Sequence, residues 1–176
     1  AATMTHDDVG DSATMRRGYA AGNSGWSGQV AVLMGDFLLA RALGMLVDLG
    51  KLEALGTVAR ATERLSQGEI FEIHISRETD TSRESYFAMV GDKTASLISA
   101  ACTLGPYLAG APATFTDAMG AYGEALGLAF QIADDVRDFT GDARTLGKPV
   151  GHDLQEGKIT LPLIMALGES PENERA

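Results

Sequence analysis

The sequence predicts an all-α fold in one domain, and three observations lead to this prediction. Apolar residues recur at helical spacing, as they do through 28–49, and no segment shows convincing strand alternation. The 176 residues are enough for a sizeable core, and the 45% apolar and 22% charged content is ordinary for a soluble globular protein. Glycine and proline stand between the helical patterns, as at Gly50 and Gly105-Pro106.

In the first half of the chain, the pattern predicts the end of one helix followed by two complete helices. The first segment, up to about residue 11, has the pattern of a helix end, and a loop rich in Gly, Ser and Asn follows at 19–27. We expect the complete helices at 28–49, with Gly50 just past its end, and at 52–75.

In the second half we expect three further helices separated by polar loops. Thr81 begins the first of them, with Glu84 completing a capping box, and Gly105-Pro106 breaks or kinks it near residue 104. The next helix covers about 114–139. The last starts at about residue 153 or 157 and ends near 167, and a polar tail follows.

Glycines lie inside several of these helical patterns, where each costs about 1 kcal/mol relative to alanine. We expect helices to approach closely at these positions, or to leave a cavity between them. The glycines concerned are Gly35, Gly91, Gly120, Gly123 and Gly127.

Composition excludes some classes of protein and indicates a compartment. The net charge of −10 argues against general nucleic-acid binding. The single cysteine, Cys102, cannot form an intrachain disulfide, so the sequence fits a reducing, cytoplasmic compartment. No signal peptide is visible. The most apolar window, 29–49, contains Asp36, Arg41 and Asp48, which favours a buried core helix over a transmembrane segment.

An acidic motif interrupts the helical pattern at 130–138. Asp134 and Asp138 are four residues apart, which predicts that they share a helix face with Asp135 beside them. Carboxylates grouped on one buried face repel each other unless a cation lies between them. Oxygen ligands with positions left open for phosphate favour Mg²⁺.

The same Asp-Asp-x-x-Asp pattern occurs near the start of the chain, at Asp7, Asp8 and Asp11. One acidic triplet is weak evidence, because such triplets occur on many solvated helix faces. Two copies far apart in sequence predict two helices that face each other across a cavity, with metal ions between them.

Metal ions held in this way can bind a diphosphate, which also needs basic and polar donors. Each basic residue taken singly is equally well a solvated surface charge. Gln131, three residues before Asp134, can donate to a substrate or make a helix–helix contact. The candidate diphosphate ligands are Arg16, Arg17, Lys93 with the Thr94 hydroxyl, Lys148 and Lys158.

The ordered motifs of the chain resemble those of the trans-polyprenyl diphosphate synthase family. Besides the two aspartate motifs, they are Arg-Arg-Gly at 16–18, Gly-Asp-Phe-Leu-Leu-Ala at 35–40, Gly-Glu at 68–69, Lys-Thr-Ala-Ser-Leu at 93–97, Gly-x-Ala-Phe-Gln-Ile at 127–132, Gly-Lys-Pro at 147–149 and Gly-Lys-Ile-Thr-Leu-Pro at 157–162. The match covers nearly the whole chain, and the joint occurrence of the motifs is very specific.

The resemblance implies an isoprenoid-synthase-like helical bundle around a central cavity. Three Mg²⁺ ions would bridge the two motifs to an allylic diphosphate, with Asp7, Asp11 and Asp134 as direct ligands and Asp8, Asp135, Asp138 and Asp153 in support. Arg16, Lys93 and Lys148 would hold the allylic diphosphate, and Arg17 that of isopentenyl diphosphate. Ionisation gives an allylic cation, which isopentenyl diphosphate attacks before a proton leaves.

The same comparison predicts the product and the extent of the domain. The growing chain should pass Ala2 and Thr3, one turn before Asp7, and such small residues favour products longer than farnesyl. Replacing Ala2 with Phe should shorten the product. Residues 1–176 form one partial domain that lacks helices which the family has before the first motif and after the second.

Other functions compatible with these motifs are a class I terpene cyclase and a non-catalytic regulatory subunit or fragment. Arg17 and the intact second motif argue against the cyclase, and intact aspartates in both motifs argue against the subunit. Relatives are usually homodimers, and the apolar helix at 28–49 is a candidate interface.

Overall fold

The structure is a computed structural model that describes residues 2–10, 15–16, 19–20, 27–76, 81–141 and 150–170. The chain divides into two compact units, one formed by residues 1–55 with 142–149 and the other by residues 56–141 with 150–176. The described residues are predominantly helical, which confirms the all-α fold.

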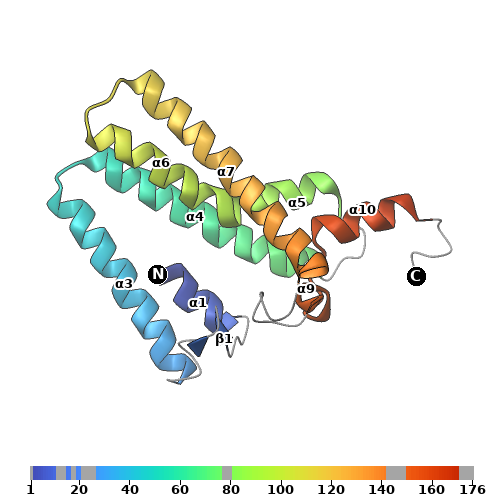
Figure 1. Cartoon of the computed structure of the whole chain (residues 1–176). Helices are drawn as coiled ribbons and strands as arrows, with labels where there is room; N and C mark the ends of the chain where they lie inside the picture. Colours follow the sequence, from blue (N-terminus) through green and yellow to red (C-terminus); the bar gives the residue numbers. More distant parts are fainter. Residues whose placement is uncertain are drawn as a thin grey trace. The chain divides into compact units, whose positions relative to one another are not determined.

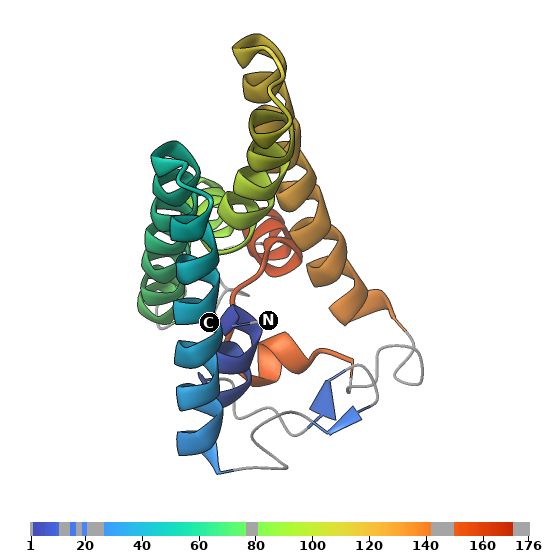
Figure 2. The same cartoon turned by 90° about the vertical axis from the view of Figure 1, so that its left-hand side faces the viewer.

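The first unit contains α1 (Ala2–Gly10), β1 (Met15–Arg16), β2 (Tyr19–Ala20) and α3 (Gly28–Asp48). The two strands pair antiparallel, with Met15 opposite Ala20 and Arg16 opposite Tyr19. The sequence does not predict this pair, because a strand of two residues is too short to show alternation. Helices α1 and α3 lie side by side in both views of the molecule (Figures 1 and 2).

A glycine on α3 lets α1 approach closely. A Cβ atom at Gly35 would overlap the imidazole ring of His6, so only glycine leaves room for this ring. His6 Nε2 lies 3.1 Å from the carbonyl oxygen of Val32 and 3.2 Å from Oδ1 of Asp36. The prediction of close helix approach is therefore confirmed at Gly35.

Helix α3 has the predicted bounds but not the predicted burial. It begins after Ser27, whose hydroxyl accepts a hydrogen bond from the Val30 N–H, and Gly50 follows it with φ +63°. Only Ala31 and Gly35 are buried in it, so the prediction of a buried core helix is wrong for the chain described here. The reason is length, because α1 has 9 residues and covers only part of a 21-residue helix.

By length and composition alone, α3 is also the one helix among the described residues that can span a membrane. A core helix of a soluble protein passes the same test. The predicted absence of a transmembrane segment therefore stays a prediction.

The second unit contains most of the described helices. It begins inside α4, at residue 56, and includes every described helix after it. They are α4 (Leu52–Ile75), α5 (Arg83–Val90), the π-helix η1 (Gly91–Ala95), α6 (Ser96–Leu108), α7 (Ala113–Thr140), α9 (His152–Gln155) and α10 (Leu161–Glu169). Its core is built from Ile75, Tyr86, Met89, Val90 and Ile164. These residues come from α4, α5 and α10, so the core joins segments that are far apart in the sequence.

Helix α7 packs closely against α6 and η1 because glycines line its buried face (Figures 1 and 2). A Cβ at Gly123 would lie 2.8 Å from the Ser99 Cα, and one at Gly127 would lie 2.5 Å from the Ala95 Cα. Real Cβ atoms are not found so close to backbone atoms. The close approach predicted from the internal glycines is confirmed at both positions.

Three predicted boundaries in this unit are wrong. Helix α5 is capped by Ser82, not Thr81, because the Thr81 hydroxyl donates to the Ile75 carbonyl. Helix α6 continues through Pro106 to Leu108; the proline lies in its last turn, where little helix remains to be disturbed. The single last helix is split into α9 and α10, with Gly157 at φ +77° between them.

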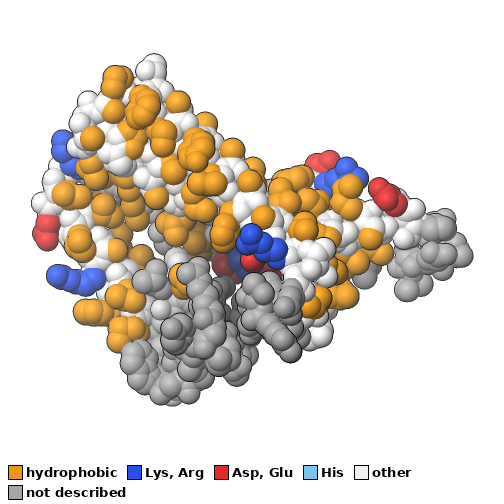
Figure 3. Space-filling model, viewed as in Figure 1, with side chains coloured by type: hydrophobic (Ala, Val, Ile, Leu, Met, Phe, Trp, Pro, Cys, Tyr) orange, Lys and Arg blue, Asp and Glu red, His pale blue; other side chains and the backbone are white. Residues whose placement is uncertain are grey.

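Apolar side chains remain exposed on α6 and α7. Figure 3 shows hydrophobic groups gathered over both helices on the face in view. The exposed large residues of these helices include Leu97, Leu108, Phe115, Tyr122, Leu126 and Phe130. Both helices therefore keep apolar surface that the described part of the chain does not cover.

Candidate active site

The second aspartate motif lies near the C-terminal end of α7, and its three carboxylates differ in exposure. Asp135 and Asp138 are only 2% and 1% exposed, whereas Asp134 is exposed. Asp134 and Asp138 are four residues apart on the continuous helix α7, as predicted, but the expected burial of the whole acidic face is found only for Asp135 and Asp138. The buried face of α7 runs through Gly127, Asp135 and Asp138, and Asp134 lies beside it.

Asp135 is held by two hydrogen bonds. The Tyr86 hydroxyl on α5 donates to its Oδ2 over 2.5 Å, and the Gln131 Nε2 donates to its Oδ1 over 2.9 Å. Burial raises the pKa of Asp135; the two hydrogen bonds oppose this shift, and the charges of Asp153 and Asp134 add to it. Burial, followed by the bond to Asp135, also raises the pKa of Tyr86.

Thr94 extends this arrangement into η1. Its hydroxyl donates to the Gln131 Oε1 over 3.0 Å, while the Gln131 amide donates to Asp135. Thr94, Gln131 and Asp135 therefore form a continuous chain of hydrogen bonds. Three residues predicted from separate motifs are thereby brought together, and both ends of the Gln131 side chain are fixed.

Lys93 occupies the position before Thr94 and forms ion pairs with α4. Its Nζ lies 2.5 Å from Oε2 of Glu72 and 3.2 Å from Oε2 of Glu69. The Lys93 side chain is 19% exposed. The role of Lys93 as a diphosphate ligand stays a prediction, and the structure shows that two carboxylates of α4 fix its direction.

Asp153 and Lys158 lie at the two ends of α9. The backbone N–H of Asp153 donates to Oδ2 of Asp138 over 3.1 Å, which fastens α9 to the acidic motif. Lys158 Nζ lies 2.9 Å from Glu156 Oε2. Its side chain lines a small pocket formed with Glu72, Ile75, Ser76, Met89, Ile159 and Thr160.

The remaining predicted residues belong to the first unit. Asp7 and Asp8 lie on α1 and Arg16 lies in β1. Asp11, Arg17 and Lys148 lie outside the described residues. Among the side chains that the structure describes, no three carboxylate, imidazole or thiolate groups converge closely enough to hold a metal ion.

Sequence analysis missed three kinds of supporting residue in this site. Glu69 and Glu72 carried a signal, since they are three residues apart and so share a face of α4. Tyr86 carried none, because its partner is 49 residues away. Arg64, which binds Asp92 beside Lys93, was equally invisible in the sequence.

The fold and the site together define an all-α domain in which a buried aspartate motif is joined to a lysine–threonine pair on a neighbouring π-helix. A family model described as polyprenyl synthetase matches residues 1–176. The chain belongs to the polyprenyl synthetase family.

Relatives within this family resemble the chain over nearly its whole length. It is 40% identical over 174 residues to an all-trans-nonaprenyl-diphosphate synthase (geranyl-diphosphate specific) of Rhodobacter capsulatus, covering 99% of this chain and 53% of that protein. It is 40% identical over 166 residues to the octaprenyl diphosphate synthase of Escherichia coli K12, covering 94% of this chain and 51% of that enzyme.

A solved structure shares the fold. The polyprenyl synthase of Caulobacter crescentus CB15, complexed with calcium and isoprenyl diphosphate, matches with a TM-score of 0.93 and 42% identity, over 98% of this chain and 53% of that one. The chain thus spans about half the length of the relatives that it matches.

Proposed function

We propose that the polypeptide carrying this chain is a prenyltransferase that condenses isopentenyl diphosphate with an allylic diphosphate. The observation that carries the proposal is the hydrogen-bonded chain from Thr94 through Gln131 to Asp135, beside Lys93. This chain links two motifs of the family, because the Gln131 amide bonds Asp135 and the Thr94 hydroxyl bonds Gln131, with Lys93 next to Thr94 in the sequence. Such donors suit a diphosphate leaving group.

The residues present fit a divalent cation, and we propose Mg²⁺. The donor set is entirely carboxylate oxygen, which hard cations prefer. Asp134 and Asp135 are neighbours on α7, and the Asp153 backbone N–H donates to Asp138, so carboxylate residues of α7 and α9 lie in one region. Asp134 is the exposed member, and Asp7, Asp8 and Asp11 would supply further ligands.

Three Mg²⁺ ions bound between the motifs would neutralise the charge that develops on the leaving diphosphate. In this proposal Asp7, Asp11 and Asp134 are direct ligands. Asp8 and Asp153 support them, as do Asp135, whose two oxygens accept from Tyr86 and Gln131, and Asp138, whose Oδ2 accepts from the Asp153 N–H.

The basic residues divide between the two substrates. Arg16, Lys93 and Lys148 hold the allylic diphosphate, Arg17 holds that of isopentenyl diphosphate, and Lys158 is a further candidate diphosphate ligand. Glu69 and Glu72 fix the direction of the Lys93 ammonium. The allylic C–O bond breaks with its electron pair on the diphosphate, the double bond of isopentenyl diphosphate attacks the cation, and the released diphosphate accepts the departing proton.

We propose products longer than farnesyl. The relatives in Rhodobacter capsulatus and Escherichia coli are named for nonaprenyl and octaprenyl products. Ala2, at the start of α1, is small, so a growing chain that passes it meets little obstruction. In the elongation assay, the Ala2→Phe variant should give a shorter product ladder at similar total turnover; an unchanged ladder contradicts this role for α1.

We also propose a cytoplasmic homodimer in which α3 contributes to the interface. Its large exposed apolar side chains, such as Leu33 and Phe37, each 60% exposed, support a role in association. A second copy of the chain is the simplest partner that can cover them.

The site assignment is tested with a substitution at the exposed member of the second motif. Asp134→Asn keeps the shape of the side chain and removes its charge, and we expect kcat/KM for prenyl transfer to fall about a hundredfold or more. The matched control is Asp117→Asn, an exposed position on the same helix, which should retain wild-type activity. Equal activity in the two variants would overturn the role of the motif.

A further inference from the structure

The π-helix η1 is the feature of the second unit that local sequence explains least. It covers Gly91–Ala95 between α5 and α6, and the N–H of Ser96 bonds to the carbonyl of Gly91, five residues back. A π-turn widens the helix and gains little locally, so it persists where surrounding contacts determine it. This segment carries both Lys93 and Thr94.

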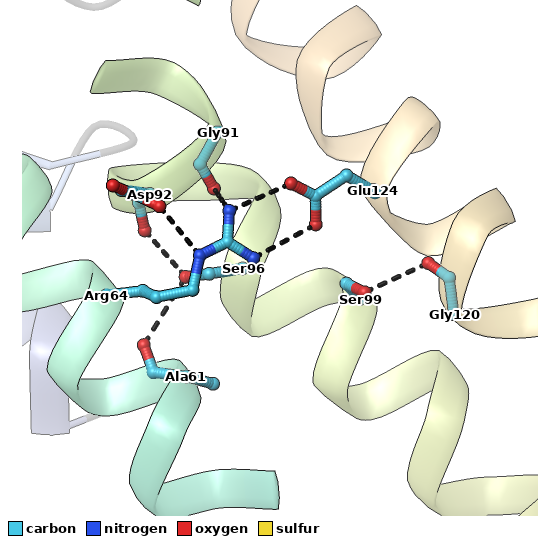
Figure 4. Close-up of polar contacts among 8 residues, drawn as sticks. All are labelled: Ala61, Arg64, Gly91, Asp92, Ser96, Ser99, Gly120 and Glu124. Atoms are coloured by element: carbon cyan, nitrogen blue, oxygen red, sulfur yellow. Dashed lines mark hydrogen bonds and ion pairs between the residues drawn. The ribbon is translucent and has the colours of Figure 1, made fainter. Parts of the chain in front are cut away.

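Arg64 on α4 supplies the main polar contacts to the start of this segment (Figure 4). Its Nε donates to Asp92 Oδ1 over 2.6 Å, and its Nη2 donates to the Gly91 carbonyl over 3.1 Å. The same guanidinium binds both oxygens of Glu124 on α7, at 3.0 and 3.4 Å. One planar group thereby joins α4, η1 and α7.

The bonds to Glu124 fix the orientation of the Arg64 guanidinium as well as its position. Glu124 lies on the opposite side of the guanidinium from Asp92, so its two bonds set the plane in which Arg64 faces the π-turn (Figure 4). The hydrogen bond to Glu124 raises the pKa of Arg64 and burial opposes it, so the group stays charged.

Close backbone packing leaves η1 no freedom to shift sideways. A Cβ at Gly68 on α4 would overlap the backbone nitrogen of Lys93, and one at Gly127 would lie 2.5 Å from the Ala95 Cα. The Ser96 hydroxyl bonds the Asp92 carbonyl over 2.6 Å (Figure 4). The two helices hold the segment from both sides, and Arg64 holds its polar groups.

Exposure separates a positioning role from one in global stability. The side chains of Arg64, Asp92 and Glu124 are 41%, 36% and 32% exposed. Ion pairs at this level of exposure add little to the free energy of unfolding, because solvent screens them. Their geometric effect on a strained segment is retained, since two donors of one rigid group, Nε and Nη2, are committed to it.

We infer that Arg64 is a positioning residue that holds the π-helical conformation of Gly91–Ala95 and thereby aims Lys93 and Thr94 at the substrate diphosphate, with Glu124 orienting Arg64. This inference rests on the proposed function for the nature of the ligand. The inference goes beyond the proposed function because it assigns a role to Arg64 and Glu124, neither of which is proposed to touch substrate or metal.

The test compares Arg64→Gln with Arg60→Gln in the full polypeptide. Arg60 is a matched control on the same helix, because it is exposed and its side chain bonds Thr57 within α4. Three quantities are measured well below the unfolding temperature: the Kd of inorganic diphosphate with Mg²⁺ by calorimetry, kcat and KM for the allylic substrate, and amide hydrogen exchange of residues 91–96.

We expect Arg64→Gln to weaken diphosphate binding about tenfold and to lower kcat/KM between about tenfold and about a hundredfold. Exchange at 91–96 should accelerate about tenfold while α10 is unchanged. Arg60→Gln should match the wild type in all three. Arg64→Gln that is folded, binds diphosphate within twofold of wild type and shows unchanged exchange would overturn the inference.

Two further variants keep the inference testable if Arg64→Gln does not fold. Arg64→Lys keeps the charge but cannot reach Asp92, Gly91 and Glu124 together, so it should recover part of the lost affinity. Glu124→Gln should weaken binding less than Arg64→Gln, with Asp117→Asn on α7 as its control. Wild-type affinity in Glu124→Gln together with no difference between lysine and glutamine at position 64 would contradict the orienting role.

Failure of the proposed function gives a different result. A wild-type protein that neither binds inorganic diphosphate nor elongates refutes the function and the aim assigned to Lys93 and Thr94. Hydrogen exchange still decides whether Arg64 holds the π-helix, because that measurement needs no ligand.

Discussion

A single buried carboxylate connects the functional residues of the second unit. Asp135 accepts hydrogen bonds from Tyr86 and Gln131, and through Gln131 it is linked to Thr94. Because it is 2% exposed, water does not replace a lost partner. The arrangement of the site therefore depends on each of these bonds.

The Tyr86→Phe variant tests this dependence. The ring of Tyr86 is fully buried, so phenylalanine keeps the packing and removes only the donor to Asp135. We expect the free energy of unfolding to fall by about 1–3 kcal/mol, measured by urea denaturation. Tyr122→Phe is the control, since Tyr122 is 56% exposed and its change should be close to zero. Similar losses in both variants would show that the Asp135 bond contributes nothing specific.

Site residues could be predicted from the sequence where they belong to a motif, but their hydrogen-bond and ion-pair partners could not. The aspartates of the second motif and Gln131 were named from helical spacing, Lys93 and Thr94 were named as donors for a diphosphate, and the structure joins Thr94, Gln131 and Asp135. The outward position of Asp134 was not predicted, because helical spacing gives relative angles but not which face is buried. The pairing of Lys93 with Glu69 and Glu72 depends on tertiary contacts.

At the scale of elements, helix packing in the second unit depends on glycines, which have no side chain, at the positions where the helices touch. Gly127→Ala would place a Cβ 2.5 Å from the Ala95 Cα and push α7 away from η1. Alanine favours a helix by about 1 kcal/mol, but overpacking costs about 1–3 kcal/mol, so we expect net destabilisation. Chemical denaturation measures the change.

Gly105→Ala is the matched control for this substitution. Gly105 also lies inside a helix, α6, and a Cβ there would meet nothing within 4 Å. It should therefore leave stability unchanged or raise it by up to about 1 kcal/mol. If Gly127→Ala were as stable as Gly105→Ala, the close-packing account of α7 would be wrong.

The existence of the helices was predictable because the apolar periodicity agreed with the glycine and proline residues that separate the helical segments. The bounds of α4 match the prediction. Predicted helix boundaries were wrong where two neighbouring polar residues could each cap the helix. Thr81 and Ser82 both suit an N-cap, and only the tertiary bond of Thr81 to Ile75 decides between them. The π-turn at Gly91 has no signature in the apolar pattern, because the contacts that surround it come from α4 and α7, which are distant in the sequence.

At the scale of the whole molecule, α3 leaves a large apolar surface uncovered by the part of the chain that the structure describes. If a second copy covers it, as we propose, the wild-type polypeptide should sediment at twice its monomer mass. Leu33→Glu should shift it toward the monomer, because a charge placed in an apolar interface is costly. Ala42→Glu adds the same charge at an exposed position about half a turn round α3 from Leu33 and should not. A wild-type monomer would contradict the proposed homodimer.

The central claim is metal-dependent prenyl transfer, and incorporation of labelled isopentenyl diphosphate tests it most directly. The purified full polypeptide would be incubated with geranyl or farnesyl diphosphate, with Mg²⁺ and again with excess chelator. We predict chain elongation beyond farnesyl with Mg²⁺ and none without it. No elongation by folded protein that retains its metal would contradict the account; elongation that persists in chelator would contradict the role of the aspartate motifs.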